Sequence, residues 1–483
     1  MPPAFTKEEI EAEDKKPKRK VAVLIGYSGT GYKGMQFDHM QKTIEGDLFT
    51  AFVAAGAISK ANADDPKKSS LVRCARTDKG VHAASNVISL KLIIDDPDIV
   101  QKINSHLSPQ IRVWGILRTV GSFSCYQACD SRWYEYLIPT CSFLPPHPSS
   151  YIGKKLVELA EEAGDLEGYK ERQEEVLGFW EETENQYIKP ILDSLDQQTR
   201  ELVEEALYKV STTKAQFEDP DENETDVDEN EDENNSKISI QKKSDAADRT
   251  GQPPANESED SIAPDQQTRD PASEEGEKDF DQASSKADTI AAETVDKAHL
   301  DAAIKTLRQA YIAAKQRHRI SPERLSRVKA AFARYVGTKN FHNYTVRKQA
   351  KDPSAKRHIK SFTVSDTPIE IGGTEWLSLK VHGQSFMMHQ IRKMIGLAAL
   401  IVRAGCPVER IDETLGEDVV AIPKAPGLGL LLERPVFESY NEKAETKFQR
   451  EPIDFGKFEV EIEEFKRKEI YERIFAEEER DNV

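Results

Sequence analysis

The stretch ARTDKGVHAASNVISLKL, residues 75–92, is the most informative part of this chain. It places a carboxylate, Asp78, in a short turn that ends at Gly80, and an apolar run follows over residues 81–92. A turn before a strand holds a side chain on a rigid support, where catalytic groups are often found. The pattern also fits an ordinary turn in which Asp78 hydrogen-bonds its own backbone and Gly80 supplies a positive φ. The rest of the sequence must decide between these interpretations.

Strand-like and helix-like segments alternate along the chain. Apolar runs predict strands over residues 21–27, 81–92, 111–120, 131–138 and 374–381. Helical spacing predicts helices over residues 43–57, 98–107, 151–214 and 388–403, the last one ended by Gly405 and Pro407. A mixed-charge amphipathic helix is expected over 460–476, without an assigned role. This alternation predicts an α/β or α+β protein.

Negative charge is concentrated in one part of the chain. Residues 217–300 include 26 acidic and 8 basic residues, which account for the whole net charge of −18. Such a stretch has too little apolar surface to offset its ordering entropy, so we expect disorder there.

We divide the chain into a flexible basic arm (1–20), a first catalytic half (21–142), a helical and then acidic insertion (143–299), a second catalytic half (300–440) and a charged C-terminal helix or tail (441–483).

Positive charge is concentrated just after the acidic stretch. Residues 305–360, here called the basic block, contain 16 lysines and arginines but only two acidic residues, Glu323 and Asp352. Five aromatic residues alternate with these charges: Tyr311, Phe332, Tyr335, Phe341 and Tyr344. This mixture is typical of a surface that follows an RNA backbone, and it also fits a solvated helix face.

Cysteine usage and apolar runs indicate the compartment. Five cysteines without a paired framework favour free thiols in a reducing environment. Cys125, Cys129 and Cys141 could supply three zinc ligands, but no fourth ligand completes the set, so we expect buried thiols and no metal. The longest apolar run, residues 394–402, is too short to span a membrane, and we expect neither a membrane segment nor a signal peptide. The basic run at 15–20 fits a nuclear import signal or an arm near RNA, and we expect a nuclear protein.

Residues 75–83, ARTDKGVHA, resemble the active-site signature of the TruA family of tRNA pseudouridine synthases. Further segments resemble the family's other motifs in the same order: GYSGTGYKGMQ (26–36), SRWYEY (131–136), FMMHQIRKMIG (386–396) and PGLGL (426–430). NFHNYT (340–345) and MMHQ (387–390) resemble the eukaryotic branch. The resemblance covers about residues 21–139 and 327–440. It implies an α/β fold of two similar halves, whose antiparallel and mixed sheets join around a central catalytic cleft.

The resemblance implies an RNA isomerase that converts uridine to pseudouridine in tRNA, with other RNAs left open. The reaction breaks the C1′–N1 bond, turns the base, joins C1′ to C5 and removes the C5 proton. It needs no cofactor, and the sequence contains no phosphate loop or dinucleotide fingerprint. We expect a monomer with RNA as its partner. Two other classes stay open, an RNA-binding protein without turnover and an acidic scaffold for nuclear partners, and substitution of Asp78 would separate them.

The family motifs assign three catalytic residues. Asp78 would be the nucleophile toward a uridine turned out of the RNA stack, although its target, C1′, C6 or the C2′ proton, is left open. Arg392 would hold this carboxylate ionised and oriented. Tyr134 would stack on the uracil and help to remove the C5 proton. Tyr136 is expected to be structural, and His82 is expected to be a turn residue with satisfied hydrogen bonds.

The other candidates are substrate contacts. Arg76 would fill the gap left by the extruded uridine or bind its phosphate. Arg132 completes the family's Arg-x-Tyr pattern, and Leu428 would pack on the target ring. Phosphate contacts are expected from Lys33 in the glycine-rich loop and from three residues of the basic block, Arg347, Lys348 and Lys351.

Overall fold

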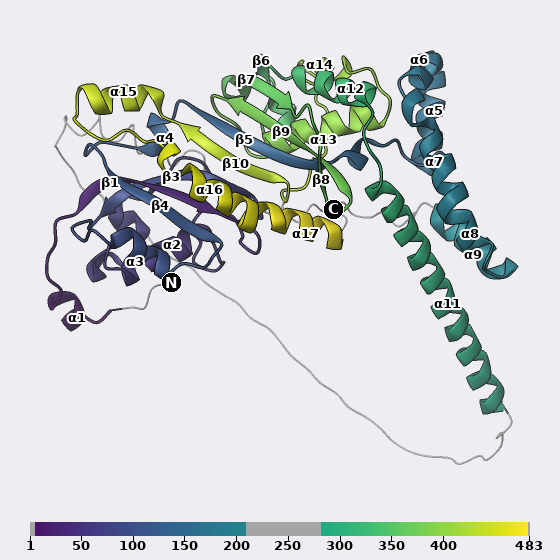
Figure 1. Ribbon diagram of the computed structural model, residues 1–483, viewed down its shortest axis with the longest axis horizontal. Coiled ribbons are helices and arrows are strands. Elements are labelled where there is room, and N and C mark those ends of the chain that lie inside the picture. The colour runs from purple at the N-terminus through teal and green to yellow at the C-terminus, as the bar shows by residue number, and fades with distance from the viewer. Residues whose placement is uncertain (1–4, 209–281, 482–483) are drawn as a thin grey trace, which may run out of the picture. The chain divides into compact units, whose positions relative to one another are not determined.

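The computed structural model of the chain describes residues 5–208 and 282–481 (Figure 1). The chain divides into two compact units, one comprising Met1–Arg200 with Lys305–Val483 and the other Glu201–Ile304. Of the second unit, only the end of helix α9 (Gln197–Tyr208) and the beginning of helix α11 (Gln282–Gln316) are described. Most of the acidic stretch that we predict to be disordered, residues 209–281, therefore lies outside the described residues.

A ten-stranded sheet is the centre of the larger unit. Its strands are β1 (Arg19–Tyr27), β2 (Val72–Arg73), β3 (His82–Leu92), β4 (Ile111–Arg118), β5 (Ser131–Pro139), β6 (Gly337–Asn340), β7 (Lys356–Val364), β8 (Ile369–Ile371), β9 (Thr374–Gly383) and β10 (Leu430–Val436). They are ordered β4-β1-β3-β10-β5-β9-β7-β6, while β2 pairs with β3 and β8 with β9. The predicted α/β class is confirmed.

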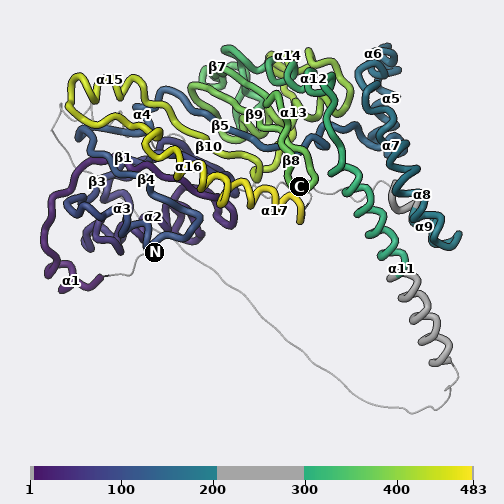
Figure 2. Tube along the Cα trace, in the orientation of Figure 1, coloured from purple at the N-terminus to yellow at the C-terminus, as the bar shows by residue number. Residues whose placement is uncertain are grey.

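Strand β10 joins parts of the chain that are far apart in sequence. It pairs in parallel with β3, where Leu431 faces His82, and antiparallel with β5, where Leu432 faces Tyr134. Figure 2 shows β10, in yellow, alongside β5, in blue. Strand β5 also pairs with β9. The division into halves at 21–142 and 300–440 stays a prediction, and the strands of these two segments are interleaved in one sheet.

Four helices pack against one face of the sheet, here called the inner face: α2 (Ile44–Ala54), α3 (Ile99–Ser105), α12 (Pro322–Ala333) and α13 (Gln390–Arg403). The buried apolar residues of this face and of the four helices form the inner-face cluster. Thr43 begins α2, and its side chain accepts a hydrogen bond from the Gly46 N–H. In α13 the predicted spacing is confirmed, because Ile391, Ile395 and Val402 are buried in the inner-face cluster. Each such side chain contributes roughly 1.5–3 kcal/mol on burial.

The opposite, outer face is covered by the C-terminal segment of the chain, α16 (Glu459–Phe465), the π-helical turn η9 (Lys466–Tyr471) and α17 (Glu472–Asp481) (Figure 1). Ile462, Phe465, Ile470 and Ile474 from this segment pack against Ala84, Leu137, Trp376 and Leu431 of the sheet. The amphipathic helix predicted over 460–476 is confirmed, and its apolar stripe forms this cover.

The other helices are α1 (Lys7–Glu11), α4 (Cys125–Ala128), α5 (Tyr151–Glu162), α6 (Leu166–Glu171), α7 (Leu177–Thr183), α8 (Lys189–Leu192), α14 (Arg410–Glu413) and α15 (Glu438–Thr446). The helical character predicted for residues 151–214 is confirmed as far as Tyr208. Helix α1 lies within the predicted N-terminal arm and begins with a capping box between Thr6 and Glu9.

The aromatic residues of the basic block belong largely to the core. Phe332, Tyr335, Phe341 and Tyr344 are fully buried in the inner-face cluster, and the Tyr335 hydroxyl donates to the Met394 carbonyl oxygen at 2.9 Å. A ring without any exposed surface cannot stack on a base. The prediction that these four rings follow RNA is therefore wrong, and their spacing reflects core packing.

Several basic residues of the same block are neutralised within the protein. The fully buried Arg324 donates to Glu175 at 2.8 Å and also binds the Phe143 carbonyl oxygen. Arg334 pairs with Glu409 and Asp412, acidic residues outside the block. The excess of basic residues in the sequence thus overstates the charge that the surface presents.

Candidate active site

Asp78 lies in the turn that precedes β3. The Val81 N–H donates to the Asp78 carbonyl oxygen at 3.1 Å, and Gly80 has a φ of +75°. The Asp78 side chain is 25% exposed. The turn is closed by this hydrogen bond, and its carboxylate still reaches the solvent.

The glycine-rich loop at residues 28–36 supports this turn. The Met35 N–H donates to the Thr77 carbonyl oxygen at 3.1 Å, and the Thr77 and Tyr27 hydroxyls lie 2.9 Å apart. A Cβ atom on Gly29 would lie only 2.2 Å from the Val81 carbonyl oxygen. Glycine is required at position 29 because the two backbones touch there.

The His82 side chain links its own motif, residues 75–83, to the motifs at 26–36 and 426–430 through hydrogen bonds. Its Nδ1 accepts a hydrogen bond from the Gly29 N–H at 3.1 Å, so its Nε2 carries the hydrogen and donates to the Leu428 carbonyl oxygen at 3.1 Å. Burial lowers the pKa of His82 to about 4, which keeps the ring neutral. The expectation of a satisfied turn histidine is confirmed.

Two side chains at the beginning of α13 approach Asp78. Arg392 Nη1 lies 3.9 Å from Asp78 Oδ2, and His389 Nε2 lies 3.7 Å from the same oxygen. The sequence predicted Arg392 and missed His389. The sequence carried no signal for His389, because this residue stands just before α13 in a left-handed backbone conformation and not on a regular helical turn.

The loop at residues 423–429 fixes the position of Arg392. Its Nε donates to the Ala425 carbonyl oxygen at 2.7 Å, and its own carbonyl oxygen accepts from the Ala425 N–H at 3.0 Å. The Tyr136 hydroxyl donates to the Pro426 carbonyl oxygen at 3.0 Å and so braces the same loop. Tyr136 thus has the structural position that we expected.

Tyr134 lies on the inner face of β5. It belongs to the same apolar cluster as Ala75, Val81 and Ile391, which flank the Asp78 turn and the beginning of α13. Its ring meets Phe386 edge to face at 5.2 Å. Burial raises the pKa of Tyr134 well above its usual value, so its phenol stays protonated at neutral pH.

The predicted substrate contacts occupy different environments. Arg132 is buried and donates to the carbonyl oxygens of Cys74 at 2.8 Å and Gln384 at 3.2 Å. The half-buried Leu428 packs with the outer-face cluster, so its side chain is not grouped with Tyr134. Four basic candidates, Lys33, Arg76, Arg347 and Lys351, are exposed, and Lys348 pairs with Asp352 at 3.1 Å.

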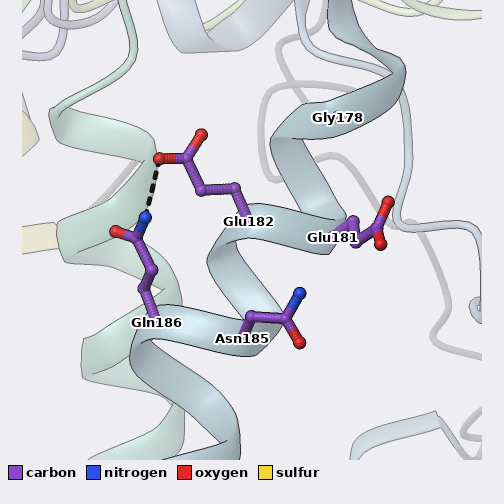
Figure 3. A pocket seen from close by; sticks show the side chains of 5 residues that line it. All are labelled: Gly178, Glu181, Glu182, Asn185 and Gln186. Carbon is purple, nitrogen blue, oxygen red and sulfur yellow. Dashed lines mark hydrogen bonds between the residues drawn. The ribbon is translucent and has the colours of Figure 1, made fainter.

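Two hollows lie apart from Asp78. One, on α7 and the following turn, is lined by Gly178, Glu181, Glu182, Asn185 and Gln186, and the Gln186 side chain donates to Glu182 at 2.8 Å (Figure 3). The other is a cavity of about 280 Å³ behind the 423–429 loop, lined by residues of β5, α13 and α17. None of the three predicted catalytic residues lines either hollow.

Two of the three cysteines considered as zinc ligands bind the backbone. Cys125 Sγ donates to the Val72 carbonyl oxygen and Cys129 Sγ to the Ser131 carbonyl oxygen, both at 3.2 Å. Within residues 5–208 and 282–481, no three histidine, cysteine or acidic side chains are grouped as a metal would require. No helix in these described ranges combines the length and apolar character needed to cross a bilayer.

Comparison with known proteins gives consistent matches. Residues 331–438 match the profile of the tRNA pseudouridine synthase family. The chain is 43% identical to tRNA pseudouridine synthase 1 of Yarrowia lipolytica, over 98% of this chain and 74% of that protein. It is also 43% identical to tRNA pseudouridine synthase 1 of Schizosaccharomyces pombe, over 99% of this chain and 84% of the relative. The tRNA pseudouridine(27/28) synthase of Saccharomyces cerevisiae is 32% identical over 87% of this chain and 85% of its own length.

The family match and these relatives define an isomerase, an enzyme that rearranges its substrate without adding or removing atoms. More particularly, the chain belongs to the tRNA pseudouridine synthase family, as its motifs predicted.

Proposed function

We propose that this enzyme converts uridine to pseudouridine in tRNA and that Asp78 is its nucleophile. The observation that carries the proposal is the position of Asp78, a partly exposed carboxylate on a hydrogen-bonded turn beside Arg392. A carboxylate is ionised at neutral pH and can form a separable covalent intermediate. The relatives named for the same reaction in tRNA support the substrate.

The chemistry is a balanced rearrangement. The C1′–N1 bond breaks, C1′ bonds to C5, the C5 proton leaves and N1 ends with a proton. Asp78 has three possible targets, and attack on the sugar C1′ or on the base C6 gives a covalent adduct, whereas removal of the C2′ proton does not. Arg392 places a positive charge beside the carboxylate, since its guanidinium is held near Asp78 by the Ala425 carbonyl oxygen.

Tyr134 contributes in its protonated form. Burial raises its pKa, so a phenolate would be costly at neutral pH, and the hydroxyl acts as a hydrogen-bond donor or relay during loss of the C5 proton. The buried Arg132 supports this arrangement from the same face of β5, since it binds the Cys74 carbonyl oxygen four residues before Asp78.

The exposed basic residues fit a role in RNA binding. Arg76 and Lys33 lie on the two loops that form the Asp78 turn and its support, and Arg347 and Lys351 lie in the basic block. Other RNAs, such as small nuclear RNA and messenger RNA, are further proposed substrates, because phosphate contacts do not read sequence. We also propose that the enzyme acts as a monomer in the nucleus, the latter because the basic residues of the 15–20 run are largely exposed.

The decisive test is Asp78→Asn, assayed with tRNA that carries uridine or 5-fluorouridine at the target. The variant should lose turnover and adduct formation while its tRNA affinity stays within a few fold, because the change removes only the charge. Asp95→Asn, an exposed carboxylate of the same half, is the matched control. Turnover by pure Asp78→Asn above a protein-free blank would exclude the assignment. Normal wild-type turnover without any adduct would favour removal of the C2′ proton.

A further inference from the structure

His389 combines burial, an unusual backbone conformation and closeness to Asp78. Only 3% of its side chain is exposed, and Nε2 lies 3.7 Å from Asp78 Oδ2. Its φ of +60° is the left-handed conformation, which a residue with a Cβ rarely adopts. Strained residues of this kind tend to occur at functional sites.

His389 and Arg392 approach the same oxygen of Asp78. Both short distances, 3.7 Å and 3.9 Å, end at Oδ2. Two groups gathered on Oδ2 orient the carboxylate plane, and Oδ1 becomes the oxygen that faces the substrate. A distance of 3.7 Å in a protein without substrate can shorten when the substrate binds.

Arg392 is held beside Asp78 by a neighbouring loop. Its Nε is engaged by the Ala425 carbonyl oxygen, so the 423–429 loop sets the position of its guanidinium, and Nη1 reaches Asp78 only at 3.9 Å. Arg392 brings a positive charge to Asp78 Oδ2, and His389 approaches the same oxygen from three residues earlier in the chain. The imidazole donates from Nε2 when it is protonated or when it is the neutral tautomer with hydrogen on Nε2.

We propose that His389 is a positioning residue that holds Asp78 Oδ2 through Nε2 and thereby aims Oδ1 at the uridine. This inference rests on the proposed role of Asp78. It assigns His389 to the chemical step and not to the binding of RNA, because His389 is buried against Asp78.

Two amide substitutions separate this role from a purely structural one. In His389→Gln the side-chain N–H reaches about as far as Nε2, whereas in His389→Asn it reaches only as far as Nδ1. Asparagine, however, accepts the left-handed backbone conformation better than glutamine. A positioning role predicts that Gln is the more active variant, and a backbone role predicts that Asn is.

The experiment measures kcat and KM for the full chain with tRNA, together with its melting temperature. We expect His389→Gln within about fivefold of the wild-type kcat and His389→Asn roughly 10–100-fold lower, with both KM values nearly unchanged, since a 1 Å misplacement of a reacting group costs about 10²-fold. His318→Asn, a buried histidine packed against Phe179, is the matched control and should keep its kcat. If His389→Asn does not fold, His389→Gly replaces it, because glycine accepts the same backbone conformation.

Equal activity of the Asn and Gln variants, or higher activity of Asn, would overturn the proposal. Failure of this inference is distinguishable from failure of the proposed function. Turnover by Asp78→Asn would exclude the nucleophile itself. An inactive Asp78→Asn together with a fully active His389→Asn would exclude only the role of His389.

Discussion

The two faces of strand β5 both carry polar side chains, and they use them in opposite ways. On the inner face, Tyr134 and Arg132 lie beside a site whose carboxylate, Asp78, stays 25% exposed. On the outer face, Glu135 is buried, accepts a hydrogen bond from the Tyr471 hydroxyl at 2.5 Å and lies 3.6 Å from Lys466 Nζ.

The outer-face charges are grouped around one buried lysine. Lys466 is buried and also lies 2.9 Å from Glu433 and 3.3 Å from Glu463. Burial opposes the charge of Lys466, but the carboxylates of Glu433 and Glu135 outweigh it and raise the pKa of Lys466. Mutual pairing fixes the C-terminal helix on the sheet, whereas the inner face keeps one carboxylate available to a substrate. Substitutions on the inner face should therefore lower turnover, and those on the outer face should lower stability.

The largest effect is expected at Arg392 on the inner-face site. Arg392→Ala should lower kcat by several orders of magnitude, because Asp78 is deprived of its neighbouring positive charge. Arg392→Lys should restore part of the activity, since an ammonium keeps the charge but lacks the planar guanidinium that the Ala425 carbonyl oxygen holds beside Asp78. Single-turnover kinetics would measure both, with Arg403→Ala on the same helix as control. Near-normal turnover of Arg392→Ala would show that Arg392 does not support Asp78 in the reaction.

The next effect is expected on the outer face. Lys466→Met should lower the free energy of unfolding by about 3–5 kcal/mol, because Glu135 and Glu433 are left buried without their cation. Activity per folded molecule should stay near normal. Urea unfolding measures the change, and Lys457→Met, which removes an exposed ion pair with Glu451, should change stability far less.

Because the folded-state pKa of Lys466 is raised, the contribution of Lys466 to stability is complete below pH 10.5 and is lost at higher pH. Unchanged stability would mean that these charges do not hold the helix.

A smaller effect on the free energy of unfolding is expected from His82, which lies near Arg473 of helix α17. Its pKa is about 4 in the folded protein against an ordinary 6.5, so its contribution is complete above pH 6.5 and is lost as the pH falls toward 4. The contribution is at most ~3 kcal/mol. Unfolding of His82→Gln between pH 4 and 6.5 should show a shallower dependence on pH, whereas the exposed His358→Gln should match the wild type. Equal slopes in the wild type and His82→Gln would show that His82 is not buried as a neutral ring.

The smallest effect on kcat is expected in the basic block. Replacing Arg347, Lys348 and Lys351 by Ala should raise KM more than it lowers kcat, because these residues would position RNA. The log–log slope of affinity against salt should flatten by roughly 0.7–0.9 for each phosphate that the variant no longer neutralises. Lys348 should contribute least, since it pairs with Asp352. Arg334→Ala, at a position paired with Glu409 and Asp412, is the control. An unchanged slope in the triple variant would place the RNA on another surface.

Much of the fold could be predicted because apolar periodicity is a local property. The strands at β1 and β3 and the helix α13 lie where their apolar patterns indicated. The same local signal predicted the C-terminal amphipathic helix but not the face that it covers, because its partners, such as Trp376 and Leu431, come from distant strands.

The candidate site was predicted only in part. The motifs indicated Asp78 and Arg392, and the structure brings these two together. His389 was missed because its closeness to Asp78 depends on the left-handed turn before α13, which the sequence does not reveal. The aromatic residues of the basic block were misinterpreted because charged and apolar residues also alternate where a helix, here α12, and the segment after it pack against a core.

The insertion of β10 between β3 and β5 has a consequence for synthesis on the ribosome. His82 and the Leu428 carbonyl oxygen that it binds are 346 positions apart. At a translation rate of roughly 5–20 residues per second, about 20–70 s pass between the appearance of the Asp78 turn and that of its last neighbours. During this interval β3 has an unpaired edge that must be kept from other chains, and the nascent enzyme cannot modify RNA. Activity therefore begins only after translation has passed Leu428.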